Sequence, residues 1–143
     1  MPLTAGGDLV DRAVINEEEE GNLADNPWDP CYNPAKCGNC VFYAACRMGI
    51  VFPLDLTKIE NKCKLINRTY PQVGFAVIID AARPYGHIAY ISYVANSGTI
   101  YIHEGNWNGG CNYRSISPND ATIIGYYDPS IGPGQHDCGY YGH

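Results

Sequence analysis

The sequence predicts an α+β domain in which helices come first and an antiparallel β-sheet follows. The compact apolar segment 40–48 lies between Asn39, a good N-cap, and Gly49, a good helix terminator, which predicts a helix there. From residue 73 onward, short segments rich in β-branched and aromatic residues alternate with Gly, Pro, Asn and Asp, which predicts a meander of strands. Seven cysteines in 143 residues indicate that disulfides stabilise the domain.

The remaining elements follow from the same kind of pattern. A second, more polar helix is predicted at 58–67, with Thr57 as N-cap and Glu60 as its capping-box partner. The strands are expected at 75–80, 87–95, 99–104, 113–117 and 122–127.

The length fits one domain with a core of its own, flanked by two less regular segments. Residues 1–27 are rich in glycine and acidic residues and are predicted to form an extended or disordered arm, which could mediate self-association. Residues 28–128 form the expected domain, and residues 129–143 form a Gly/Pro-rich tail.

Charge argues against some partners. Nine Lys and Arg against 15 Asp and Glu give a net charge of −6, so we expect no nucleic-acid binding, which needs a basic face. No segment approaches the ~20 apolar residues of a membrane-spanning helix.

The odd number of cysteines suggests three disulfides and one free, reactive thiol, Cys40. Such a cysteine content is typical of small secreted proteins, which predicts an extracellular location. The disulfide candidates are Cys31, Cys37, Cys46, Cys63, Cys111 and Cys138.

Two other uses of the cysteines are weaker. A zinc site usually has two paired ligand knuckles, whereas here only Cys37 and Cys40 are closely spaced and the outer spacings are too long. A thioredoxin-like redox pair would need a βαβ context that the pattern does not contain. We therefore expect no metal and no cofactor.

Cys40 occupies the first turn of the predicted helix 40–48. The unpaired N–H groups of a helix N-terminus stabilise a thiolate and can also bind an oxyanion, as a cysteine nucleophile requires. The alternative is that Cys40 is one more disulfide partner and Cys37 is the spare thiol.

The hairpin of the second and third strands supplies the partners. If Val94 pairs with Thr99, then His87, Glu104 and Asn106 lie on one face of the sheet, and a shift of one residue would destroy this arrangement. His87 would then be the base, with Glu104 or Asn106 holding its other ring nitrogen.

Two further residues are candidates for substrate binding. Asn39 lies next to the thiol, and Trp107 follows Asn106, where its ring could stack on a sugar or a peptide. A core aromatic is an equally good interpretation of Trp107.

Several segments, in this order and spacing, resemble the CHAP domain, the cysteine- and histidine-dependent amidohydrolase/peptidase of the NlpC-type papain-like superfamily: 38–44, 71–77, 86–89, 104–109 and 113–114. The resemblance implies a papain-like α+β fold with Cys40 as nucleophile, His87 as base, and Glu104 and Asn106 as polar supports. It also implies hydrolysis of amide bonds, most often in peptidoglycan, by an N-acetylmuramoyl-L-alanine amidase or an endopeptidase, or of other peptide amides.

A second hypothesis keeps the fold without the chemistry. The disulfides and the Gly/Tyr-rich tail also suit a non-catalytic extracellular structural module that assembles through the arm at 1–27.

Overall fold

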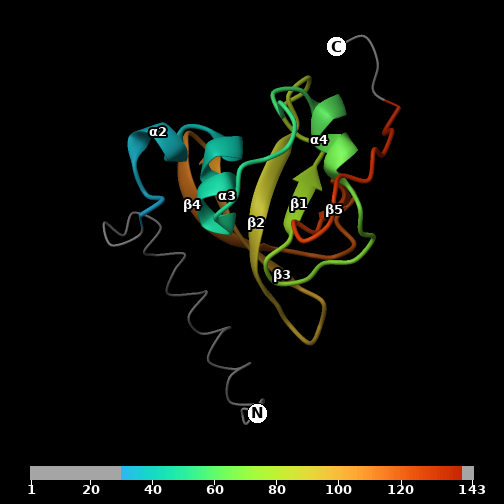
Figure 1. Ribbon diagram of the computed structural model, residues 1–143. Helices are drawn as coiled ribbons and strands as arrows, with labels where there is room; N and C mark the ends of the chain where they lie inside the picture. Colours follow the sequence, from blue (N-terminus) through green and yellow to red (C-terminus); the bar gives the residue numbers. More distant parts are fainter. Residues whose placement is uncertain (1–29, 140–143) are drawn as a thin grey trace.

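The computed structural model of the protein describes residues 30–139, and in this range helices precede a five-stranded antiparallel sheet, as the sequence predicts (Figure 1). The helices are α2 (Pro34–Cys37), α3 (Cys40–Met48) and α4 (Ile59–Leu65). The strands are β1 (Ala76–Ile79), β2 (His87–Val94), β3 (Ile100–Trp107), β4 (Gly110–Ile116) and β5 (Ile123–Tyr127). The predicted arm at 1–27 lies outside the described residues.

The sheet has the strand order β4-β3-β2-β1-β5 and is apolar on both faces. Because side chains alternate along a strand, neighbouring residues of β1 and β2 enter different clusters. Ala76, Ile78 and Ile88 pack with α3 and α4, whereas Val77 and Ala89 belong to a second cluster with β3 and β5. Helix α3 packs on β2 and β3, which brings its first residue close to their ends.

Helix α3 has the predicted bounds because both of its caps are present. The side-chain oxygen of Asn39 accepts hydrogen bonds from the backbone N–H groups of Val41 at 2.9 Å and Phe42 at 3.0 Å. Gly49 ends the helix in the left-handed conformation, with φ of 68°. These local interactions place Cys40 in the first turn.

The capping box predicted for α4 is wrong. Thr57 does not cap the helix, because both its backbone N–H and its hydroxyl donate to the side chain of Asp55, at 3.0 and 2.6 Å. The N-cap is instead Lys58, whose side chain makes no capping hydrogen bond, and the helix spans Ile59–Leu65 rather than 58–67. It ends early because the backbone of Ile66 is not helical, with ψ of 120°, and leads to Arg68, which forms a bridge with Tyr126 of β5.

The hairpin of β3 and β4 is tighter than predicted. Its turn is Asn108-Gly109, in which both residues have positive φ, of 55° and 86°. Asn-Gly is a preferred sequence for such two-residue turns. Strand β3 therefore continues to Trp107, and β4 begins at Gly110.

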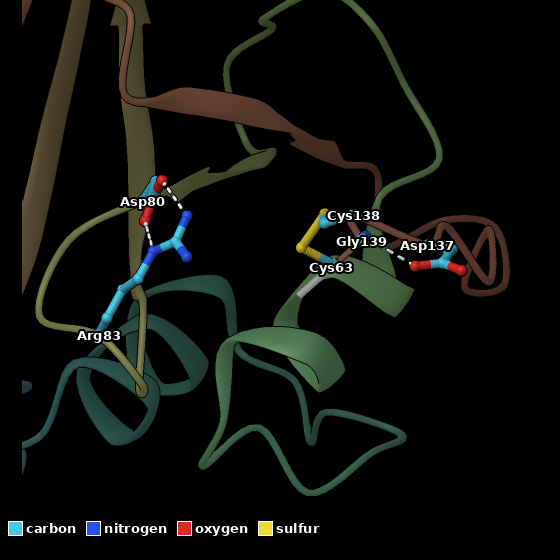
Figure 2. The surroundings of a disulfide bond; sticks show 6 residues. All are labelled: Cys63, Asp80, Arg83, Asp137, Cys138 and Gly139. Carbon is cyan, nitrogen blue, oxygen red and sulfur yellow. Dashed lines mark hydrogen bonds and ion pairs between the residues drawn. A yellow bond between two sulfur atoms is a disulfide. The ribbon is translucent and has the colours of Figure 1, made fainter. Parts of the chain in front are cut away.

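Within residues 30–139, which contain all seven cysteines, three disulfides tie the helices to other segments, and Cys40 is the free cysteine. Figure 2 shows the bond that ties α4 to the C-terminal tail. The pairs are Cys31–Cys46, Cys37–Cys111 and Cys63–Cys138.

Within residues 30–139, no helix has both the length and the apolar character needed to cross a membrane.

Candidate active site

Cys40 and His87 come together from two elements. Cys40 is the first residue of α3, and His87 is the first residue of β2. Their side chains share a hydrogen bond, and His87 is 4% exposed. A thiol and an imidazole in contact at a helix N-terminus are the elements of an activated cysteine nucleophile.

A β-bulge decides which face of the sheet receives the partner of His87. Near the turn, Val94 pairs with Ile100 rather than with Thr99, so the predicted register is wrong there by one residue. The register shifts between Ile91 and Tyr93, and at Ile91 and Tyr90, on the side of His87, it is the predicted one. The extra residue is Ser92, whose hydroxyl donates to the carbonyl of Tyr101 at 3.1 Å. The bulge restores the strand parity that places His87 and Glu104 on one face.

Glu104 is the residue that meets His87. Its Oε1 atom lies 2.8 Å from Nε2 of His87, and its side chain is completely buried. Oε2 accepts hydrogen bonds from the side-chain amide of Asn112 at 2.8 Å and from Nε of Arg114 at 2.6 Å. A buried carboxylate is stable only when it is paired and hydrogen-bonded, and here His87 and Arg114 supply the pairing.

The pKa of the Cys40 thiol is lowered and the pKa of the His87 imidazole is raised, and both changes favour an ion pair between them. Burial alone would raise the pKa of Cys40, but the hydrogen bond to His87 and the positive charges of His87 and Lys62 outweigh it and lower that pKa. Burial would likewise lower the pKa of His87, but its hydrogen bonds to Cys40 and Glu104 raise it above its ordinary value. The geometry therefore favours a thiolate beside an imidazolium.

The same balance keeps Glu104 ionised. Burial would raise the pKa of its carboxyl group, yet the hydrogen bonds from His87, Arg114 and Asn112 lower it below the ordinary value. A charged Glu104 both orients the His87 ring and stabilises its protonated form.

Gly105 allows α3 to approach β3 closely. A Cβ atom at this position would lie 2.7 Å from Cβ of Tyr43 and 3.0 Å from the carbonyl oxygen of Asn39. Both neighbours belong to the start of α3, which carries Cys40. The missing side chain of Gly105 thus sets the separation between the thiol and the strand that carries Glu104.

Cys40 opens onto a cleft of about 530 Å³. One wall is apolar and includes Phe42 and Val51, which are 58% and 93% exposed. Its polar groups come from Lys62, Asp55, Asn39 and Asn106.

The other predicted site residues take different positions. Asn106 is exposed, has a positive φ of 54° and lines the cleft, while Glu104 occupies the place beside His87. Asn39 also lines the cleft, although its side-chain oxygen is used to cap α3. The Trp107 ring lies beside the His87 ring, with 5.1 Å between the ring centroids and a tilt of 48°, and the Arg114 guanidinium covers it at 3.8 Å.

Three residues of the site were not predicted from the sequence. Asn112 and Arg114 form hydrogen bonds with Glu104. The Asn108-Gly109 sequence, which favours a tight turn, could have indicated that their strand pairs with β3. Lys62 is 1% exposed and lines the cleft, and no local pattern marks it. In the described part of the chain, no cluster of three His, Cys, Asp or Glu side chains could hold a metal ion.

Comparison with known proteins places the chain in a family. Residues 30–106 match the CHAP domain. The structure of an N-acetylmuramoyl-L-alanine amidase from Staphylococcus aureus is similar, with 27% identity and a TM-score of 0.50 over 62% of this chain and 30% of the amidase chain. Ly7917 is similar in fold, with 17% identity and a TM-score of 0.51 over 87% of this chain and 62% of Ly7917.

The chain thus spans less than a third of the amidase chain and under two thirds of Ly7917. No curated protein sequence matches it. Because the CHAP match extends over more than half of its 143 residues and coincides with the segment that carries Cys40, His87 and Glu104, the chain belongs to the CHAP domain family.

Proposed function

We propose that the protein is an extracellular cysteine amidase or endopeptidase that hydrolyses amide bonds in peptidoglycan. The observation that carries the proposal is the thiol of Cys40 at a helix N-terminus, hydrogen-bonded to His87, which is itself paired with the buried Glu104. Membership of the CHAP family and the similarity to a Staphylococcus aureus N-acetylmuramoyl-L-alanine amidase support peptidoglycan as the substrate. The three disulfides support an oxidising, extracellular location.

The first half of the reaction forms an acyl-enzyme. The Cys40 thiolate attacks the carbonyl carbon of the scissile amide, so a C–S bond forms and the carbonyl oxygen becomes an oxyanion. Asn39 accepts hydrogen bonds from the N–H groups of Val41 and Phe42, so we assign the binding of that oxyanion to the backbone N–H of Cys40 itself. Protonated His87 gives its proton to the amide nitrogen as the C–N bond breaks.

The second half releases the product. His87, now neutral, accepts a proton from a water molecule, whose oxygen attacks the thioester carbonyl. The C–S bond then breaks, which returns Cys40 as a thiolate and His87 as an imidazolium. Glu104 holds the ring in place throughout and compensates the charge of the imidazolium.

The cleft suits the peptide part of the substrate better than its glycan. Exposed apolar side chains such as Phe42 and Val51 can cover methyl groups of a peptide stem, whereas a glycan presents mainly hydroxyl groups. Asn39 and Asn106 at the cleft would then bind peptide N–H and C=O groups next to the scissile bond.

The test is to incubate purified peptidoglycan with the protein and with Cys40→Ala, and to identify the released fragments by mass spectrometry. We expect new free amines with the wild type, at the alanine attached to muramic acid for an amidase or within the stem or cross-bridge for an endopeptidase. Cys40→Ala should release none. Equal release by both proteins would refute the proposal, and release by neither would favour a non-catalytic structural module.

A further inference from the structure

Lys62 is a buried cation that takes no part in the proposed acylation and hydrolysis steps. Its side chain is 1% exposed, although lysine is among the residues least often buried. It belongs to α4, away from both α3 and the hairpin that supply Cys40, His87 and Glu104. A buried ammonium is costly unless its N–H groups are satisfied and its charge is compensated.

Two backbone carbonyl groups accept hydrogen bonds from the ammonium. Nζ of Lys62 donates to the backbone oxygen of Leu56 and to that of Tyr85, each at 2.7 Å. Tyr85 lies only two residues before His87, in the loop between β1 and β2. Lys62 therefore ties α4 to the backbone that leads directly into the histidine.

The same loop is held at further points. Arg83 forms two hydrogen bonds of 2.8 Å with Asp80, as Figure 2 shows. The carbonyl of Pro84 accepts a hydrogen bond of 3.0 Å from the N–H of Ile59 at the start of α4. Gly86 fits against Ile59, where a Cβ atom would lie 2.9 Å from the isoleucine side chain. The approach to His87 is thus docked on the helix that carries Lys62.

Lys62 shares a cleft with the thiol. Both Lys62 and Cys40 line the cleft, and the positive charge of Lys62 acts on the Cys40 sulfur. The other charged groups acting on these two are His87, on Cys40, and the exposed Asp55, on Lys62. Because Cys63 is next in sequence and forms a disulfide with Cys138, the helix that presents the ammonium is covalently fixed to the tail (Figure 2).

We infer that Lys62 is a positioning residue of the active site, which holds the backbone before His87 and supplies a fixed positive charge that stabilises the Cys40 thiolate. The inference rests on the proposed function only in taking Cys40 as the nucleophile. Its test needs no substrate: the rate at which a neutral reagent, iodoacetamide, alkylates Cys40 reports the thiolate directly.

The experiment compares the pH dependence of this rate in the wild type, Lys62→Met and Lys62→Gln. Glutamine keeps an N–H donor without the charge, whereas methionine removes both. We expect both variants to react on the order of 10-fold more slowly than the wild type near pH 6, because a buried cation that lines the same cleft stabilises a thiolate more than a solvated one would. The rates should converge at high pH, where every thiol is ionised. Lys64→Met, an exposed lysine on the same helix, should match the wild type throughout.

A pH profile of folded Lys62→Gln that coincides with the wild type would overturn the inference. If neither variant folds, the native protein decides the matter by NMR titration of the Lys62 ammonium before and after Cys40 is blocked with iodoacetamide. Burial lowers the pKa of Lys62 and the negative charge of the Cys40 thiolate partly offsets this, so blocking Cys40 should lower that pKa further. An unchanged titration of Lys62 would equally contradict the inference. Because both readouts follow thiol and amine chemistry, failure to cleave peptidoglycan would leave them intact.

Discussion

Nε2 of His87 lies 2.8 Å from Oε1 of Glu104, although 17 residues and a bulged hairpin separate them in the chain. Glu104 in turn is held by Arg114 and Asn112 from the next strand. The histidine is therefore oriented by a carboxylate that three strands place together.

Replacing Glu104 by Gln should make the free energy of unfolding less dependent on pH in the acidic range. The folded-state pKa of Glu104 lies below its ordinary value of 4.5, so its charged contacts stabilise the fold above pH 4.5. This contribution is lost as the pH falls through the folded-state pKa. Urea unfolding at pH 7 should show a loss on the order of 2 kcal/mol in Glu104→Gln, because charge-assisted hydrogen bonds disappear. The difference between the two proteins should shrink below pH 4.5, and a constant difference would show that the charge of Glu104 does not stabilise the fold.

Replacing His87 by Gln should weaken the thiolate of Cys40. The hydrogen bond and charge of His87 lower the pKa of that thiol, so alkylation of the variant by iodoacetamide should be markedly slower near pH 6 and equally fast at high pH. His136→Gln, an exposed histidine in the tail, is the matched control and should react like the wild type. If both histidine variants retain the wild-type profile, His87 does not activate the thiol.

Replacing Asn39 by Ala should impair both stability and reactivity. The cap that Asn39 forms at α3 contributes about 1 kcal/mol to folding, as measured for such residues in other helices. Asn33→Ala removes the same kind of cap from α2, whose first turn carries no thiol. We expect both variants to lower the free energy of unfolding in urea, but only Asn39→Ala to slow alkylation of Cys40. Equal alkylation rates in the two variants would show that the Asn39 cap does not affect the reactivity of Cys40.

Gly105→Ala should be strongly destabilising. The added methyl group would lie within 3.0 Å of the carbonyl oxygens of Lys36 and Asn39 and of the Tyr43 side chain, and forced overpacking typically costs about 1–3 kcal/mol. Gly110→Ala, in the neighbouring strand, meets no atom within 4 Å and should be nearly neutral. Thermal unfolding of the two variants gives the comparison, and similar melting temperatures would contradict the close approach of α3 to β3.

How far the sequence predicts this site depends on how local each interaction is. The α3 helix and the position of Cys40 were predicted because Asn39 and Gly49 act within one turn of the chain. The failed capping box of α4 shows the limit of such rules: Asp55, two residues away, competes for the same Thr57 groups.

Contacts between distant residues could be predicted only where the alternation of side chains along paired strands determines them. The prediction that His87 and Glu104 share a face is correct, although the predicted register at the turn is wrong by one residue. The bulge at Ser92 shifts the register by one residue and so brings both side chains to that face. Nothing local marks that bulge. Lys62 was missed for a related reason, since one of its two acceptors, Tyr85, is 23 residues away and is brought near only by packing of α4 on the loop.

The central claim, that Cys40 is the nucleophile of a hydrolase, is tested most directly by titrating the protein with iodoacetamide. At each step, mass spectrometry gives the fraction of Cys40 that is alkylated, and the release of peptidoglycan fragments gives the remaining activity. We predict that one modification per chain, mapped to Cys40, removes activity in direct proportion to its occupancy. Undiminished hydrolysis by protein whose Cys40 is fully alkylated would contradict the claim.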